Sequence, residues 1–324
     1  MDPSRDGRDI LPLDVLRSRI PNNVFHNIGK DVDKAIVQYG RLTRLNNEEA
    51  RSRFISSLFS EIVCLFGNAV VNEPEGLLDA QFTKKGKIKH HFYAMRSISI
   101  VFIEVEKYLV VGEKAYLDIL GQVLAECAAC DYANSKAQHW VPILAILCDG
   151  EKFEFIVYDS GVKHVYSSGW ITGLMDKKGM PDIFALSVKE TTEYLFDYFI
   201  MAYINGLRSF GNRSNLVASQ SISKKRPSTE KWMDALAKAE YAHTLVRKAA
   251  MLAREGASEG EIEKAEEYAA RGVDKLKESV ELLPKERQER IMESCWDGSE
   301  PIEIAMKKWR EEKWRASAAN SQAE

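Results

Sequence analysis

Cysteine is scarce in this chain, and long apolar runs are missing. The five cysteines are an odd number scattered through apolar surroundings: Cys64, Cys127, Cys130, Cys148 and Cys295. That pattern indicates buried thiols in a reducing compartment rather than a disulfide framework. No run approaches the roughly 20 apolar residues that cross a bilayer, and the polar first residues lack the apolar stretch of a signal peptide. We therefore expect a cytoplasmic or nuclear protein with no membrane partner.

An excess of charge of one sign is also missing. The 45 basic and 48 acidic residues give a formal net charge of −3, so no global basic field indicates nucleic acid. A hydrophobic content of 45% and a charged content of 29% are typical of a soluble globular protein. The 324 residues are enough for one large domain, or for one domain with an appendage.

Two acids stand inside a run that otherwise predicts a buried strand. The run ISIVFIEVEKY, residues 98–108, is apolar on both strand faces, as in a strand that is covered on both sides. Because strand side chains alternate, Phe102, Glu104 and Glu106 share one face. Ionised carboxylates in such a place are costly unless a cation lies against them. That cost makes Glu104 and Glu106 candidate functional residues.

Composition divides the chain into four regions. Residues 1–50, with three prolines and one expected helix over 29–43, form an N-terminal helical extension. Residues 51–207 hold most of the aromatic and β-branched residues and form the core. Residues 208–227, which are basic and rich in Ser and Asn, are expected to be a linker. Residues 228–324 are expected to be helical.

The core alternates helical and strand patterns. Helices are expected over 49–66, 114–132 and 189–207, and strands over 77–82, 91–111, 141–148 and 153–158. The last two strands flank Asp149-Gly150, a strong hairpin signal. The order predicts a mixed α/β sheet with helices packed on its faces.

The C-terminal region predicts an antiparallel helical hairpin. Apolar residues recur in steps of three and four from Trp232 to Ala253. Ser258 and Glu261 form a capping box that begins the next helix, which ends before Pro284. A further short helix is expected over 301–315. The hairpin, residues 228–283, is either a surface for a protein partner or self-association, or it packs back on the core.

A third acid lies upstream in similar surroundings. Asp79 stands among Leu77, Leu78 and Phe82 in a predicted strand, 25 residues before Glu104. If the two strands are neighbours, Asp79, Glu104 and Glu106 converge. Carboxylate oxygens are hard ligands that suit Mg²⁺ better than zinc.

These residues resemble the PD-(D/E)XK superfamily of restriction-endonuclease-like nucleases. The resemblance spans roughly residues 61–158, and the layout is also similar to crinkler-type proteins of fungi and oomycetes, although no kinase signature is present. It implies a restriction-endonuclease-like mixed sheet flanked by helices, followed here by the helical hairpin. It also implies Asp79 and Glu104 as ligands of Mg²⁺, with Gln122 and Glu61 as helical members of the site.

The motif departs from the family pattern. Glu106 stands at the position of the family's lysine, and Lys107 would point to the opposite strand face. Either Glu106 takes over the activation of water, or the site is degenerate. Leu78 replaces the usual proline, and Glu126 stands where one branch has tyrosine.

If the resemblance holds, it implies Mg²⁺-dependent hydrolysis of nucleic-acid phosphodiesters. Mg²⁺ would act as Lewis acid and Glu106 would orient or deprotonate the water. The connection KKGKIKHH would neutralise backbone phosphates through Lys84, Lys85, Lys87 and Lys89.

Ordinary structural interpretations exist for each feature. The three acids are otherwise solvated charges at a strand edge, the lysine-rich connection is a solvated hairpin tip, and Cys127 and Cys130 are packed thiols on one helix face. The alternative function is a non-catalytic interaction protein that keeps the nuclease-like fold as a scaffold and works through its C-terminal helices.

Overall fold

The computed structural model describes residues 10–73, 88–106, 112–176, 180–220, 229–283 and 301–320. Residues 1–283 form one compact unit, and residues 284–324 form a second. Among the described helices, none combines the length and the apolar composition that a bilayer crossing requires.

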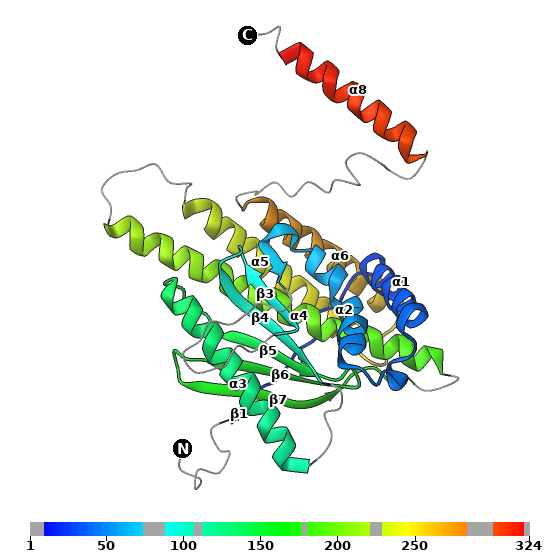
Figure 1. The fold of residues 1–324 in the computed structure, drawn as a ribbon, viewed down its shortest axis with the longest axis vertical. Helices are drawn as coiled ribbons and strands as arrows, with labels where there is room; N and C mark the ends of the chain where they lie inside the picture. The colour runs from blue at the N-terminus through cyan, green and yellow to red at the C-terminus, as the bar shows by residue number, and fades with distance from the viewer. Residues whose placement is uncertain are drawn as a thin grey trace. The chain divides into compact units, whose positions relative to one another are not determined.

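Within the described residues, a single mixed sheet of seven strands has the order β1-β7-β6-β5-β4-β3-β2 (Figure 1). The strands are Ile10–Pro12 (β1), Val70–Asn72 (β2), His90–Ala94 (β3), Ile98–Val105 (β4), Ile143–Cys148 (β5), Lys152–Asp159 (β6) and His164–Thr172 (β7). Strands β4 and β5 pair in parallel, as do β1 and β7, and the other neighbours pair antiparallel. The parallel central pair places the carboxyl ends of β4 and β5 at the same edge of the sheet.

Helices cover both faces of the sheet, as Figure 1 shows. They are Asn22–Tyr39 (α1), Glu48–Cys64 (α2), Gly112–Lys136 (α3), Pro181–Gln220 (α4), Thr229–Leu252 (α5) and Glu259–Glu281 (α6). Phe199 of α4 contacts Phe92 of β3 with ring centroids 4.8 Å apart. On the opposite face, Asn134 of α3 accepts a hydrogen bond from the backbone N–H of Ser99 at 2.9 Å. The predicted α/β class, a mixed sheet flanked by helices, is confirmed.

Strand β4 is the centre of the core. All eight of its residues are buried, as its apolar run predicted. It joins β3 through a tight turn in which Met95 and Arg96 have φ angles of 47° and 56°, the left-handed conformation that short hairpins use. Because Phe92 pairs with Val101, alternation directs Val105 toward α4 and Glu104 toward α3.

The linker predicted over residues 208–227 differs from the structure. Helix α4 continues to Gln220, and tertiary contacts pack its residues just beyond position 207 against α5. Phe210 stacks on Trp232 of α5 with ring centroids 5.0 Å apart, and Arg208 pairs with Glu240 of α5 at 2.7 Å. Serine and asparagine content alone could not reveal these contacts.

The α5–α6 hairpin is part of the first compact unit rather than a separate domain. Its inner residues Ala239, Val246 and Leu276 are buried in the same core cluster as the sheet. Ser258 caps α6 with Glu261 in the predicted capping box. The hairpin therefore packs back on the core, and this apolar face is not available to a partner.

One buried carboxylate ties the hairpin and the N-terminal segment to α4. Asp197 is fully buried and accepts two hydrogen bonds from Arg247 at 2.9 Å. It also accepts one from Ser18 at 2.7 Å, and His243 Nε2 lies 2.8 Å away. Burial alone raises the pKa of Asp197, but these partners outweigh it and leave the pKa below its usual value. The charge is therefore stable inside the protein.

Strands β1, β2 and β7 were not predicted, and the strand material predicted over 91–111 contains the β3–β4 hairpin. The β7 sequence, HVYSSGWIT, has few apolar residues and a glycine, so its strand period is weak. Strand β1 has three residues and depends on pairing with Val165–Ser167. The strand predicted over 77–82 lies outside the described residues.

Candidate functional site

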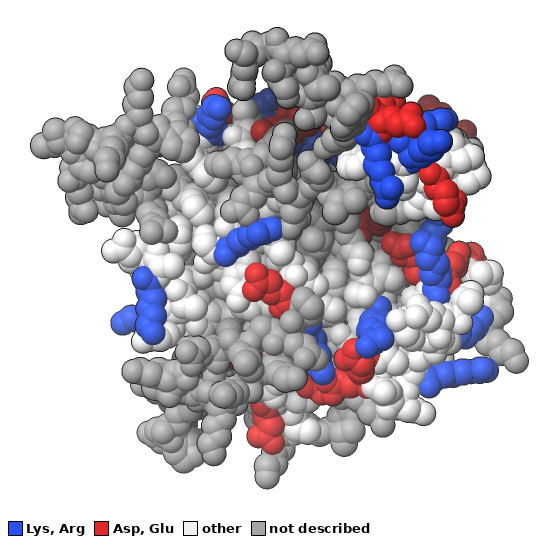
Figure 2. Space-filling model, turned by 45° about the horizontal axis from the view of Figure 1, so that its top comes forward, with Lys and Arg blue, Asp and Glu red and all other residues white. Residues whose placement is uncertain are grey.

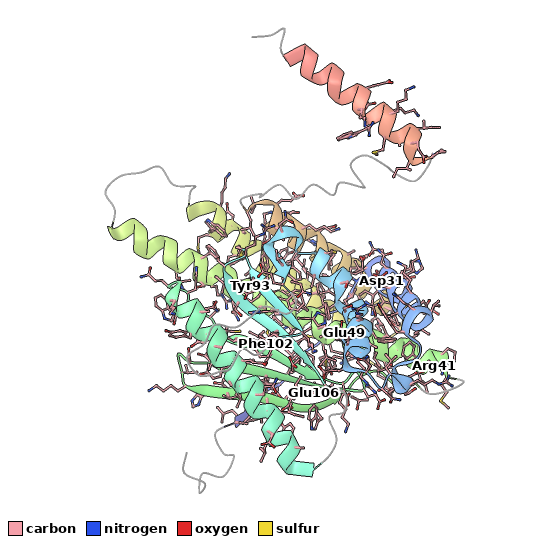
Figure 3. All side chains as sticks on the ribbon, viewed as in Figure 1. Asp31, Arg41, Glu49, Tyr93, Phe102 and Glu106 are labelled. Atoms are coloured by element: carbon pink, nitrogen blue, oxygen red, sulfur yellow. The ribbon has the colours of Figure 1, made fainter. Side chains whose placement is uncertain are left out.

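Glu104 is the acid that β4 carries into the protein interior. Its side chain is 4% exposed and lies on the α3 face of the sheet. Its Cα pairs with Leu147 of the parallel strand β5. Glu106 follows at the strand end, where its backbone N–H donates to the Cys148 carbonyl at 2.9 Å; the residue is labelled in Figure 3. The two acids thus lie at the carboxyl edge of parallel strands, where α/β sheets commonly bind ligands.

Helix α3 brings a third acid to Glu104. Glu126 is 2% exposed, and Gln122 donates a hydrogen bond to its Oε1 at 3.2 Å. The Oε2 atoms of Glu104 and Glu126 have no hydrogen-bond partner among the described residues. The structure therefore joins the predicted Gln122 to the acid cluster through Glu126, which sequence reasoning had noted only as a departure from the family pattern.

Burial and mutual repulsion make these carboxyls weak acids. Burial raises the pKa of Glu104 to about 8, and the charges of Glu126 and Glu106 add to the effect. Burial also raises the pKa of Glu126 to about 7, although the Gln122 hydrogen bond opposes it. The pKa of Glu106 is raised by burial and by the charge of Glu48. Near neutral pH the cluster therefore binds protons unless positive charge enters it.

Lys89 is the cation that borders this cluster. Its Nζ lies 2.8 Å from Glu48 Oε1, and its charge lowers the pKa of both Glu104 and Glu106. The hydrogen bond to Glu48 raises the pKa of Lys89. Lys89 is thus already paired with an acid, which reduces the charge it could offer to a phosphate.

The acid that α2 supplies to this region is Glu48 rather than the predicted Glu61. Glu48 begins α2, whereas Glu61 lies 13 residues later, about 20 Å along the helix axis. The charge of Glu61 acts on Lys34 of α1. The prediction failed because sequence spacing did not show which end of α2 approaches β4.

His90 and His91 do not belong to a basic connection. Both are buried on β3, and burial lowers the pKa of each to about 4. His90 Nε2 lies 2.9 Å from Ser52 Oγ, and His91 Nε2 lies 2.6 Å from Ser99 Oγ. At neutral pH both imidazoles are therefore uncharged parts of the core.

Several predicted site residues lie outside the described residues. They are Asp79, Lys84, Lys85 and Lys87. The convergence of Asp79 with Glu104 therefore remains a prediction.

The described donors fit a hard divalent cation in chemistry but do not complete its ligand set. The unpartnered oxygens of Glu104 and Glu126 are carboxylate donors of the type that Mg²⁺ binds. Within the described part of the chain, however, no group of three His, Cys, Asp or Glu side chains is placed to hold a metal ion. A ligand set built on Glu104 would need a donor such as Asp79.

The cysteine pair Cys127 and Cys130 is structural. Both thiols are buried, and burial raises the pKa of each, for Cys130 to about 12. Thiolates are the reactive form, so these residues behave as packed thiols.

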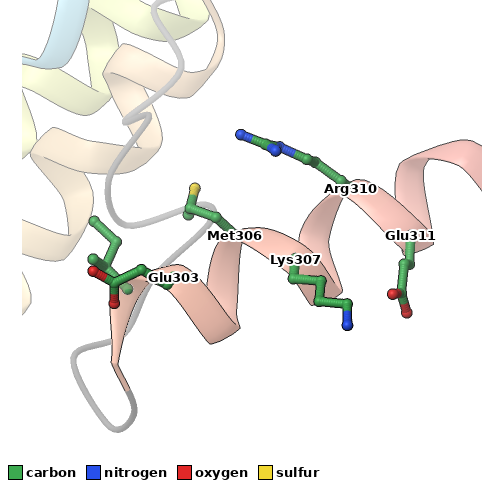
Figure 4. Close-up of a pocket in the computed structure, with 6 residues that line it drawn as sticks. Glu303, Met306, Lys307, Arg310 and Glu311 are labelled. Carbon is green, nitrogen blue, oxygen red and sulfur yellow. The ribbon is translucent and has the colours of Figure 1, made fainter.

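The visible surface shows mixed charge. On the face drawn in Figure 2, the described basic and acidic side chains are interspersed. In the second unit, a hollow along helix α8, Ile302–Asn320, is lined by six residues of that one helix: Ile302, Glu303, Met306, Lys307, Arg310 and Glu311 (Figure 4). A single helix face cannot enclose a ligand, so this hollow is not a candidate site.

No family model and no curated protein matches this chain. Among solved structures, the chain is similar to a protein chain described as "cryoEM structure DrdV-DNA complex", with 10% sequence identity and a TM-score of 0.31. The similarity covers 81% of this chain and 27% of that chain, so this chain spans about a quarter of the other's length. A likeness at this TM-score does not show the fold or the activity of this chain.

Proposed function

We propose that this protein hydrolyses phosphodiester bonds of nucleic acid with the help of Mg²⁺. The observation that supports this most strongly is the pair of buried carboxylates, Glu104 on β4 and Glu126 on α3, each with one unpartnered oxygen. Two such groups are costly in an apolar interior, and a cation between them would offset that cost.

The proposed ligands are Glu104 and Asp79. When bound, Mg²⁺ supplies Lewis acidity and a water of lowered pKa. Glu126, whose other oxygen accepts the 3.2 Å hydrogen bond from Gln122, would be a further carboxylate donor beside Glu104. These assignments rest on the resemblance together with the buried acids.

Glu106 is the proposed general base. It lies at the end of β4, half-buried, and burial raises its pKa above the usual value for glutamate. A raised pKa makes a carboxylate a better acceptor for the proton of an attacking water. In the reaction, the water oxygen bonds to phosphorus, the bond to the leaving oxygen breaks, and Glu106 takes the proton.

The test is cleavage of labelled single- and double-stranded DNA and RNA, with and without Mg²⁺. We compare the wild-type protein with Glu104→Gln, which keeps the shape of the side chain and removes its charge. Glu240→Gln, on the surface of α5, is the matched control. Loss of Mg²⁺-dependent cleavage in Glu104→Gln alone supports the proposal.

Equal cleavage by Glu104→Gln and wild type would remove Glu104 from the reaction. Absence of cleavage by the folded wild-type protein, together with no Mg²⁺-dependent rise in its melting temperature, would favour the non-catalytic scaffold instead.

A further inference from the structure

A second buried carboxylate lies in the same row of the sheet as Glu104. Across neighbouring strands, Glu104 pairs with Leu147, Leu147 with Glu154, and Glu154 with Trp170. Directly paired residues share a sheet face. Glu154 and Trp170 therefore lie on the α3 face, in line with the candidate site.

A β-bulge assembles the surroundings of Glu154. The pairing of β6 with β7 shifts between Glu154 and Ile156, whose partners are Trp170 and Ser167. Two steps along β6 thus oppose three steps along β7, so β7 carries one extra residue. Gly169 takes the left-handed φ of 62° that permits this bulge. Without the extra residue, Ser167 and Trp170 would face opposite sides of the sheet.

The bulge brings Ser167 and Trp170 close to Glu154 and to Tyr116 of α3. Ser167 Oγ and the Tyr116 hydroxyl, the latter at 2.8 Å, both donate to Glu154 Oε1. Glu154 is fully buried, and its Oε2 has no partner among the described residues. The hydrogen bond to the Glu154 carboxylate therefore holds the Tyr116 ring in position on the α3 face of the sheet.

Trp170 rests on that fixed ring and is open to solvent. The two rings meet edge to face, with centroids 5.5 Å apart and an interplanar angle of 64°. Trp170 is 38% exposed, and Leu117 on the next position of α3 is 55% exposed. Strand β1 pairs with β7 only at Val165–Ser167, so among the described residues no strand covers the edge beside Trp170.

We propose that Trp170 is a stacking platform for an unpaired nucleobase of single-stranded nucleic acid whose backbone passes the Glu104 cluster. This inference rests on the proposed function and names the substrate class. Trp170 lies three strands from Glu104, about 14 Å at the usual strand spacing. The platform is thus within the length of a short oligonucleotide.

An unpaired base suits this surface better than a duplex. The platform is a single aromatic side chain, and stacking of this kind accepts any base. In a duplex the base faces are already stacked on one another and cannot reach Trp170.

The experiment measures binding without cleavage. Fluorescence anisotropy of a labelled 12-nucleotide DNA or RNA strand in EDTA gives the Kd for wild type, Trp170→Leu and Trp140→Leu. Trp140 is 65% exposed and is the matched control. We expect Trp170→Leu to weaken binding about 5- to 150-fold, the usual effect of one lost base stack, while Trp140→Leu and wild type bind alike.

Two further variants separate stacking from misfolding. Trp170→Phe keeps an aromatic face and should retain most of the affinity. Gly169→Val keeps Trp170 but strains the left-handed backbone that places it, so it should weaken binding too. Replacing one nucleotide by an abasic residue should cost wild type as much as Trp170→Leu, and the two losses should not add.

Equal affinity of Trp170→Leu and Trp140→Leu would overturn the inference, as would a wild-type protein that binds no single strand. If Glu104→Gln cleaves normally while Trp170→Leu loses binding, the proposed reaction fails and the platform stands. If the reverse holds, the reaction stands and the platform fails.

Discussion

Replacing Glu104 by glutamine should stabilise the protein at alkaline pH and destabilise it at acidic pH. The pKa of this carboxyl rises from 4.5 to about 8 on folding. An acid with a raised pKa holds its proton in the native state while the unfolded chain loses it. The stability that protonated Glu104 contributes is therefore complete below pH 4.5 and is lost as the pH rises to about 8.

The size of the effect follows from the pKa change. Each pKa unit corresponds to about 1.4 kcal/mol, so ionised Glu104 lowers the free energy of unfolding by up to about 5 kcal/mol. Glutamine never ionises and avoids that loss. Its amide leaves a buried polar group without a full set of partners, which costs about 1–3 kcal/mol. The variant should thus gain about 2–4 kcal/mol at pH 9 and lose about 1–3 kcal/mol at pH 5.

The assay is urea unfolding followed by circular dichroism between pH 5 and 9 in EDTA, with Glu240→Gln as the control. The control should follow wild type within about 1 kcal/mol, because exposed ion pairs contribute little. A wild-type stability that stays level or rises from pH 5 to 9, with Glu104→Gln weaker throughout, would refute the assignment of Glu104 as a buried, uncompensated acid.

Three other substitutions or measurements test the fold. Asp197→Ala should cost about 3–5 kcal/mol, because it leaves Arg247 without its buried partner; a loss under 1 kcal/mol in urea unfolding would contradict this. Gly272→Ala should cost about 1–3 kcal/mol, since its Cβ would stand 2.5 Å from Val246 Cγ1; an unchanged midpoint would show that α5 and α6 can separate. A thiol reagent should modify exposed Cys64 but not Cys130 in the native protein, as peptide mass mapping can show; rapid labelling of Cys130 would indicate that α3 opens.

Local signals in the sequence predicted much of the sheet. The run of apolar residues predicted that β4 is buried. The Asp149-Gly150 turn joins β5 to β6 as expected, and Asp149 Oδ1 accepts a hydrogen bond from the Lys152 N–H at 2.8 Å. The capping box at Ser258 marked the start of α6. Each of these signals acts within a few residues, where side-chain chemistry decides the backbone conformation.

The features that escaped prediction depend on contacts between distant segments. Glu48 approaches Glu106 only because α2 packs with its first turn toward the end of β4; Glu49, in the same turn, is labelled in Figure 3. Helix α4 continues past the predicted boundary at residue 207, where Phe210 stacks on Trp232 of α5. Glu154, an acid between Phe153 and Phe155 in the strand KFEFIVYD, carried the same signal as Glu104 and could have been found by the same reasoning.

The hydrogen bonds that converge on Asp197 have a consequence for the expression of fragments. A fragment that begins at residue 51 lacks Ser18, and one that stops at residue 207 lacks His243 and Arg247. Either truncation removes at least one hydrogen-bond partner from a carboxylate that is fully buried in the intact protein. An expression product that retains every partner of this group within the whole first compact unit extends from the N-terminal segment to Leu283, and limited proteolysis should release a piece of that size rather than the isolated sheet.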